Sequence, residues 1–453
     1  MSQPADLSLH AAMEAISSGD LSPLELTHSC LDRIERLEPT IRAFITLDVE
    51  GALRQAATLT EELAGRGSRG PLHGIPIGVK DLIDVEGLPT TAASRILAGT
   101  RANVDAVVVA RLRSSGSVIL GKTNMHEFAH GVVTPPTRNP WDVQRIPGGS
   151  SGGSAAATSV GGCLGALGTD TAGSVRIPAS LCGVSGLKPR AGTVPMEGII
   201  PLSWTLDSCG PIAGSAVDLD HLWRAMTDGP ERGEAPKLRL ATPDTYSGVV
   251  DLDPEIEDAV MAAVDVLVTE GASRHVVDIP RFDEWDSARA PELLVEALVA
   301  HKEAGWWPDR AADYEDETRS YMEYAETIPG ARLISARRKL AGLKERFLAA
   351  FDDADVLAVP TTSIPAPTFE EANLVVGKLR RPAVEDLTRI CGPVNWCELA
   401  AVTVPCGLTS NGLPIGLQLL ARDEATALTA AARFQSATDH HERRPQLVED
   451  LDR

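Results

Sequence analysis

The chain of 453 residues is poor in aromatic side chains and in positive charge. Phe, Trp and Tyr make up 4% of it, so its core must be built mainly from Ala, Val, Leu and Ile. The 42 basic residues are outnumbered by 63 acidic ones, which gives a net charge of −21. Because nucleic acids and anionic membranes attract basic surfaces, this balance predicts neither as a partner. An excess of acidic residues is typical of a protein kept dissolved by its charge.

Three further absences bear on location and on metal binding. Met1–Leu7 holds no basic region followed by an apolar run, and no window approaches about 18 uninterrupted apolar residues, so we expect neither a secretory signal nor a membrane span. We also expect no cofactor. The cysteines are odd in number and form no Cys-x-x-Cys pair, which predicts reduced thiols in a cytoplasmic protein without a disulfide or zinc framework. They are Cys30, Cys163, Cys182, Cys209, Cys391, Cys397 and Cys406.

Short apolar segments alternate with helical ones along the chain. Near the N-terminus, Ser22 precedes Pro23, a usual start of a helix, and apolar residues then recur at helical spacing. Alternation of this kind predicts an α/β protein. We expect helices within 7–66 and at 106–112 and 155–160, and strands at 75–79, 117–120, 238–241, 356–360, 402–405 and 415–420.

Two matches to well-known motifs do not fit their surroundings. Gly116–Thr123 fits the phosphate-loop pattern, but its variable positions are mostly Val-Ile-Leu and read as a strand, whose N–H groups a sheet would use. His126–His130 (HEFAH) fits the zinc-protease pattern, but the helical stretch is short and no third ligand is indicated. A zinc hydrolase using His126, Glu127 and His130 is therefore kept only as a distant alternative.

The most informative segments are two loops rich in serine and glycine. The first is Pro147–Ser154 (PGGSSGGS) and the second is Gly168–Pro178 (GTDTAGSVRIP). Their small residues leave room for hydroxyl groups and for free backbone N–H groups, which attack on a carbonyl requires. Lys80, which follows the apolar run Ile75–Val79, could supply the base. A flexible linker is the alternative, but linkers do not continue into Ala-Ala-Ala-Thr and Val-Arg-Ile-Pro.

These segments resemble the amidase signature hydrolases. The resemblance runs from about Leu21 to about Gln435. It implies a mixed, twisted central sheet covered by helices on both faces. Besides the two loops, it rests on GVKD at 78–81, GKTNM at 121–125, RNPWD at 138–142, GVSGLKP at 183–189 and LPIGLQ at 413–418.

The catalytic residues implied by the resemblance are a serine pair and a lysine. Ser174 would be the nucleophile, and Ser150, joined to Gly149 by a cis peptide bond, would relay its proton to Lys80. Lysine accepts a proton only when neutral, and its free pKa is about 10.4, so work near pH 7.5 needs a depression of roughly 3 units, or about 4 kcal/mol. Burial would lower the pKa, whereas Asp81 and Asp84 would oppose the shift if they pointed inward.

The resemblance also implies an oxyanion hole on the nucleophile's own loop. Its donors would be the backbone N–H groups of Thr171, Ala172, Gly173 and Ser174. One such donor is worth about 3–4 kcal/mol in the transition state. Most members of the family have glycine where this chain has Ala172. Alanine keeps the N–H group, but it would be strained if the position needed a positive φ.

We expect a single amidase domain over 1–453. Its parts would be N-terminal helices at 1–66, the signature core at 67–285, a helical cover at 286–350, the remaining core at 351–436 and a frayed, charged tail at 437–453. The cover carries aromatic residues, including Trp306 and Trp307, and either covers a substrate entrance or packs as an ordinary helical layer. Together with Met125 and Phe128, these residues hint at an apolar or aromatic substrate.

The resemblance predicts hydrolysis of an amide-type C–N bond through an acyl-enzyme on Ser174. Amides and aryl amides come first, and carbamates (urethanes) and esters stay open. The expected partner is a small-molecule amide or carbamate, without nucleic acid or membrane, and a homodimer is left open. The main alternative is the glutaminase (A) subunit of a tRNA-dependent amidotransferase, which needs a partner subunit, an ammonia channel and residues for the α-carboxylate and amine of glutamine.

Overall fold

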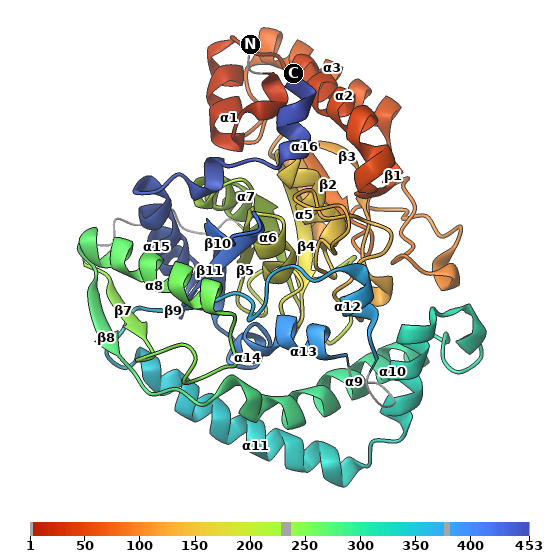
Figure 1. Ribbon diagram of the computed structural model, residues 1–453. Coiled ribbons are helices and arrows are strands. Elements are labelled where there is room, and N and C mark those ends of the chain that lie inside the picture. Colours follow the sequence, from red (N-terminus) through yellow and green to blue (C-terminus); the bar gives the residue numbers. More distant parts are fainter. Residues whose placement is uncertain (1–2, 228–236, 376–380, 453) are drawn as a thin grey trace.

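One mixed sheet runs through the computed structural model, which describes residues 3–227, 237–375 and 381–452 (Figure 1). Its strands are β1 (Phe44–Leu47), β2 (Pro76–Lys80), β3 (Val118–Thr123), β4 (Gly165–Asp170), β5 (Ser185–Lys188), β6 (Ser208–Ala213), β7 (Arg239–Thr242), β8 (Ser273–Val276), β9 (Val356–Pro360), β10 (Ala400–Leu408) and β11 (Pro414–Ala421). Among the described residues, these eleven strands pair in the order β1-β3-β2-β4-β6-β5-β10-β11-β9-β7-β8. The pairs β2–β3, β2–β4, β7–β8 and β7–β9 are parallel, and the others are antiparallel.

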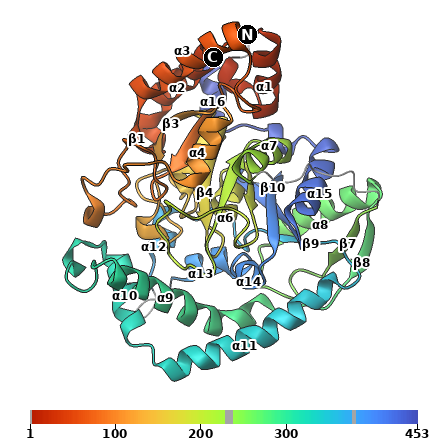
Figure 2. The same ribbon diagram turned by 180° about the vertical axis from the view of Figure 1, so that it is seen from behind.

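Helices cover both faces of the sheet, as the front and back views show (Figures 1 and 2). The predicted fold class is therefore confirmed. Within the described ranges, no helix combines the length and the apolar character needed to cross a bilayer. The helices are α1 (Leu9–Ser18), α2 (Pro23–Ile41), α3 (Val49–Arg66), α4 (Val107–Ser114), α5 (Gly152–Ser159), α6 (Arg176–Leu181), α7 (Ala216–Thr227), α8 (Pro254–Thr269), α9 (Asp286–Glu303), α10 (Asp316–Glu326), α11 (Gly330–Leu348), α12 (Phe369–Asn373), α13 (Pro382–Arg389), α14 (Gly392–Trp396), α15 (Glu424–Ser436) and α16 (Gln446–Glu449).

The central strands are buried along their whole length. Every residue of β2, β3, β4, β6 and β11 is buried. Helices on both faces keep water from both sides of such a strand, so its sequence is an apolar run rather than an alternating pattern. This is why the six strands expected from apolar runs are found, as β2, β3, β7, β9, β10 and β11.

One strand lies inside the region that was expected to be entirely helical. β1 separates α2 from α3 and pairs with β3 at the edge of the sheet. It is only four residues long, and none of its residues is fully buried. A segment this short and this exposed carries no readable period. The expected start of α2 is confirmed, because the side chains of Ser22 and Glu25 cap each other's backbone N–H groups.

The predicted helical cover consists of α9, α10 and α11, the teal and cyan helices along the bottom of Figure 1. α10 and α11 both pack against α9. The two tryptophans belong to this layer, since the ring of Trp306 lies 5.2 Å from Phe128 and that of Trp307 lies 5.8 Å from Tyr314. The aromatic cluster therefore holds the cover onto the body of the protein.

The C-terminal segment is docked, so the expectation of a frayed tail is wrong for its described residues. Arg444 donates to Asp6 Oδ1 at 2.8 Å, and Arg36 donates to the carbonyl of Leu451 at 2.9 Å. The two ends of the chain consequently lie side by side (Figure 1). Tertiary ion pairs between distant parts of a chain leave no local signal in the sequence.

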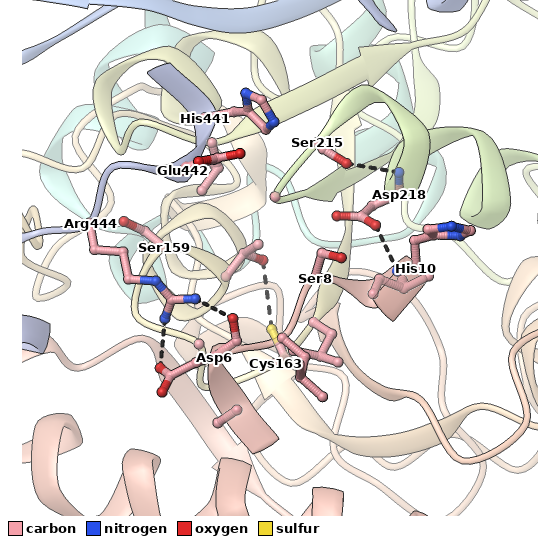
Figure 3. A pocket seen from close by; sticks show the side chains of 18 of the residues that line it. Asp6, Ser8, His10, Ser159, Cys163, Ser215, Asp218, His441, Glu442 and Arg444 are labelled. Carbon is pink, nitrogen blue, oxygen red and sulfur yellow. Dashed lines mark hydrogen bonds and ion pairs between the residues drawn. The ribbon is translucent and has the colours of Figure 1, made fainter. Parts of the chain in front are cut away.

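A cavity of about 440 Å³ lies between the two chain ends (Figure 3). Leu164, just before β4, lines it, so it faces the start of β4, whereas Asp170 lies at the other end of that strand. Two acidic side chains in its wall hold the N-terminal segment, Asp6 against the C-terminal segment and Asp218 against α7. Asp6 is bound by two arginines, and Asp218 Oδ1 accepts the backbone N–H of His10 at 2.9 Å.

Candidate active site

The predicted lysine lies at the end of β2 and faces two hydroxyl groups. Lys80 Nζ donates to Ser150 Oγ at 2.8 Å and to Thr169 Oγ1 at 2.8 Å. Ser150 belongs to the loop before α5, and Thr169 is on β4, which pairs with β2. Lys80 and Ser150 are both fully buried. The structure thus brings together two of the three residues that the resemblance implies for catalysis, and adds Thr169, which sequence reasoning missed.

The surroundings of Lys80 favour a neutral amine. Burial lowers the pKa of Lys80 to about 7, although the negative charges of Asp207 and Asp170 act in the opposite direction. Asp81 does point inward, but it lies 3.3 Å from Lys122 Nζ instead. One of the two carboxylates expected to oppose the shift is therefore paired with a different lysine. The depression matches the one that a lysine base requires near neutral pH.

Ser150 is held by a tightly packed turn. The Gly149–Ser150 peptide bond is cis, as the resemblance implies. A Cβ at Gly149 would lie 2.5 Å from Thr134 Oγ1 and 2.9 Å from Val132, so only glycine fits there. The carbonyl of Ser150 accepts the His126 N–H at 3.2 Å. These contacts set the position of the Ser150 hydroxyl against Lys80.

Ser174 stands between this buried pair and a pocket. It is 6% exposed, whereas Ser150 is 0% exposed, and it lines the pocket together with Thr171 and Ala172. Its carbonyl accepts the Ser151 N–H at 3.2 Å, which ties the two serine-rich loops together. The expected contact between the hydroxyls of Ser174 and Ser150 is not formed among the described residues. Catalytic hydrogen bonds are often long without substrate and shorten when it binds.

The loop that carries Ser174, the expected nucleophile, is organised by Asp170. Its carboxylate accepts the N–H groups of Gly173 at 2.8 Å and Val175 at 3.1 Å. Gly173 was expected to donate to an oxyanion, but its N–H is already used in this way. The N–H groups of Thr171, Ala172 and Ser174 have no acceptor within the described residues and stay candidates for that role.

The glycine-dependent position of this loop is Gly173 rather than residue 172. Gly173 has φ +121°, and a Cβ there would lie 2.6 Å from Cys391 Cβ. Ala172 is not among the residues with positive φ, so its side chain causes no backbone strain. It adds a methyl group to the pocket wall.

Asp170 is itself held by a buried cation. Arg176 donates to both Asp170 oxygens, at 2.8 and 2.9 Å, and also to Gln418 Oε1 and Asn395 Oδ1. Although burial alone would raise the pKa of Asp170, Arg176 holds it well below its usual range. A fully paired buried ion pair of this kind fixes a loop in one conformation. Asp170 and Arg176 therefore support the loop.

Asp207 is a buried carboxylate that sequence reasoning missed. It accepts the Thr171 hydroxyl at 2.5 Å and the backbone N–H groups of Leu202 and Ser203 at 2.8 and 3.0 Å. Burial raises its pKa to about 6, while these hydrogen bonds and the charge of Lys80 oppose the rise. It thus connects the nucleophile's loop to the electrostatics of Lys80. No motif marks it, because its link to the site, through Thr171, joins two loops that are 36 residues apart.

The pocket in front of Ser174 has a volume of about 200 Å³ and mostly apolar walls. The cover contributes part of them through α9 and α10, whereas Met125, Phe128, Trp306 and Trp307 do not line it. Its polar side chains other than Ser174 include His130, Arg289 and Tyr321. The lining residues are Ala129, His130, Gly131, Val132, Thr171, Ala172, Ser174, Leu202, Arg289, Ala290, Leu293, Leu294, Tyr321, Val384, Thr388 and Trp396.

The zinc-protease motif does not form a zinc site. The backbone takes the left-handed conformation at Phe128 (φ 46°) and Ala129 (φ 64°), so His126 and His130 do not share one face of a helix. His126 Nε2 lies 3.5 Å from Glu317 instead. In the part of the chain that the structure describes, no three His, Cys, Asp or Glu side chains are grouped to hold a metal ion. The geometry gives the zinc alternative no support.

The phosphate-loop match is a strand, as expected. Val118–Thr123 is β3, and Lys122 Nζ donates to Pro89 O at 2.9 Å and Thr90 Oγ1 at 3.0 Å. With Asp81 also beside it, this lysine is fully occupied by protein groups.

Comparison with known proteins places the chain in a family. A model of the Amidase family matches residues 25–427, and the chain belongs to this family. The glutamyl-tRNA(Gln) amidotransferase (A) subunit of Chloroflexus aggregans is 36% identical over 496 aligned positions, which cover 98% of each chain. Hydrolysis of amide C–N bonds is the activity that the family and the geometry have in common.

Solved structures agree with this assignment. A chain of a protein complex linked to the evolutionary origins of an s-triazine catabolic enzyme has a TM-score of 0.86 and 32% identity, over 95% of this chain and 98% of that one. The 6-aminohexanoate cyclic dimer hydrolase, complexed with substrate, has a TM-score of 0.86 and 27% identity, over 98% and 99%.

The comparison corrects the expected partners. The similar protein is by its name one component of an amidotransferase of glutamyl-tRNA, so the expectation of a small-molecule substrate without nucleic acid is wrong. That expectation rested on the net charge of −21. Net charge describes the surface of one chain and says nothing of substrates brought by other subunits. The comparison favours the amidotransferase alternative over a broad aryl-amide hydrolase.

Proposed function

We propose that this protein is the amide-cleaving (A) subunit of an amidotransferase that acts on glutamyl-tRNA, and that it releases ammonia from glutamine. The observation that carries the proposal is the 36% identity to such a subunit over 98% of both chains. The buried Lys80–Ser150 pair behind Ser174 supplies the chemistry that this role needs. A cytoplasmic location stays a prediction.

The proposed reaction runs through an acyl-enzyme. Neutral Lys80 takes a proton from Ser150 as Ser150 takes one from Ser174, and Ser174 Oγ bonds to the amide carbon. The N–H groups of Thr171, Ala172 and Ser174 stabilise the resulting oxyanion. The proton returns through Ser150 to the nitrogen as the C–N bond breaks, and ammonia leaves. Water then attacks the ester along the same route and releases the acid.

Arg289 is the proposed contact for the α-carboxylate of glutamine. It lies on α9, lines the pocket and is positioned by Asp286 at 3.0 Å and by the carbonyl of Thr388 at 2.7 Å. A guanidinium group held from one side can offer its remaining N–H groups to a carboxylate. This assignment fills a requirement that could not be met from the sequence.

The acidic surface fits a division of labour between different chains of one complex. With a net charge of −21, the chain is poorly suited to hold the phosphates of tRNA by itself. We therefore assign ammonia production to this chain and contact with tRNA to a partner subunit.

The test is ammonia release from L-glutamine by the purified protein, alone and with candidate partner subunits. Wild type should release ammonia, Ser174→Ala should not, and Ser114→Ala, which changes an exposed serine on α4, should match wild type. A panel of anilides and carbamates is run in parallel. Efficient turnover of an anilide by a protein that ignores glutamine would refute the proposal and return the function to the broad amidase class.

A further inference from the structure

His130 is a buried histidine in the wall of the catalytic pocket. It is 9% exposed and lines the pocket together with Ser174 and Arg289. Neither of its ring nitrogens has a hydrogen-bond partner in the described part of the chain. Buried polar atoms in proteins are nearly always paired, so two unpaired nitrogens beside a pocket point to a bound group as their partner.

The imidazole of His130 is held neutral. Burial, followed by the neighbouring His301 and His126, keeps its pKa well below the usual value. A neutral imidazole has one N–H donor and one nitrogen with a free lone pair. The free lone pair can accept a hydrogen bond from an amine or ammonium group.

The protein holds the His130 ring in place but gives its two nitrogens no hydrogen-bond partner. The His130 backbone N–H donates to the carbonyl of Glu127 at 3.0 Å. The ring stacks on that of Tyr321, with 6.2 Å between the ring centroids. The Tyr321 hydroxyl donates to Glu317 rather than to His130. His301 packs at 5.7 Å, and its Nδ1 bonds to the Tyr314 hydroxyl. The ring is thus fixed by stacking, and no described protein group pairs with either of its nitrogens.

We propose that His130 is a specificity-determining residue that accepts the amino group of the amide donor, while Arg289, elsewhere in the same wall, takes the carboxylate. The inference rests on the proposed function, because glutamine carries both groups. An apolar side chain at position 130 would still leave room for the acyl chain but would leave the amine unpaired. A site built around a hydrogen bond discriminates against substrates that lack the matching group.

The test compares two amides that differ only in that group. L-glutamine and glutaramate share the amide, the chain length and the carboxylate, but glutaramate has no amine. For wild type, we expect kcat/KM for ammonia release to favour L-glutamine by about tenfold or more. In His130→Leu the ratio should fall to about one through loss of activity on L-glutamine, with glutaramate within about twofold of wild type. His130→Gln, which keeps a donor and an acceptor, should restore part of the ratio.

Matched controls separate this role from a structural one. His28→Leu, at an exposed position of α2, should leave both substrates unchanged. The Tm of His130→Leu should change little, because leucine replaces the lost ring contacts with apolar packing and no protein hydrogen bond is lost. Equal losses on both substrates, an unchanged ratio in His130→Leu, or no preference in wild type would each overturn the proposal.

A second substrate pair keeps the test independent of glutamine. If the protein does not cleave L-glutamine, the proposed function fails, and 4-aminobutanamide is then compared with butanamide. The same His130-dependent preference for the amine-bearing amide is expected. Equal kcat/KM for this pair would refute the role of His130 by itself.

Discussion

Two buried lysines on neighbouring strands have different surroundings. Lys80 ends β2 and donates to the hydroxyls of Ser150 and Thr169, whereas Lys122, on β3, faces the carboxylate of Asp81 and the carbonyl of Pro89. Both are 0% exposed. A hydroxyl group can hydrogen-bond to a neutral amine and can give it a proton. A carboxylate instead stabilises the charged ammonium form. Partner chemistry, rather than burial, therefore separates a base from a structural cation.

Lys188 extends the comparison. Burial lowers its pKa to about 7, with the charge of Arg176 adding to the effect. Its Nζ, however, donates to the carbonyl of Pro189 at 2.6 Å. A depressed pKa alone does not identify a catalytic lysine. A hydroxyl must also lie within reach.

The largest effect is expected at Ser174, whose proton is proposed to pass through Ser150 to Lys80. Ser174→Ala should lower kcat/KM by about 10³-fold or more, because the variant lacks the hydroxyl that is proposed to form the acyl-enzyme. A fluorophosphonate probe should label wild type at Ser174 and fail to label the variant, as read by mass spectrometry. Thermal unfolding should be unchanged. Labelling at another serine would contradict the assignment.

Replacing Lys80 and Lys122 with methionine, one at a time, tests the difference between these two lysines. Lys80→Met should lower kcat/KM by about 10²–10⁴-fold with little change in stability, because a general base is lost. Lys122→Met should instead lower the free energy of unfolding by about 3–5 kcal/mol, because it leaves Asp81 buried and unpaired. Chemical denaturation and kinetics on the folded fraction measure both. The reverse pattern would assign the base to Lys122.

The pH profile sharpens the role of Lys80. Activity needs the neutral amine, so kcat/KM should rise with pH around a midpoint near 7, the pKa of Lys80. The charge of Asp207 favours the ammonium form, so Asp207→Asn should move this midpoint to lower pH by about half a unit to one unit. An unmoved or raised midpoint would show that Asp207 does not act on the lysine.

The smallest effect is expected at Ala172. Ala172→Gly keeps the backbone N–H and removes one methyl group from the pocket wall, so kcat/KM should stay within about threefold of wild type. A loss of more than about tenfold would mean that the methyl group positions the substrate.

Local patterns predicted the α/β class and the loops of the site, and the family resemblance added the layers of the fold and the roles of Ser150 and Ser174. Apolar runs marked the buried strands, and the serine-glycine loops marked the residues that meet Lys80. Asp207 and the docking of Arg444 on Asp6 could not be predicted, since each joins segments far apart in the chain. The lack of partners at His130 could not be predicted either, because its two ring nitrogens are seen to be unpaired only once the pocket is built.

The adjacent chain ends have a practical consequence. Both termini emerge on the side of the molecule away from α9, whose residues line the pocket (Figure 1). An affinity tag or a surface linker attached at either terminus would leave the mouth of the pocket turned toward the solution. Immobilised protein should thus keep access to its substrates whichever end is tethered.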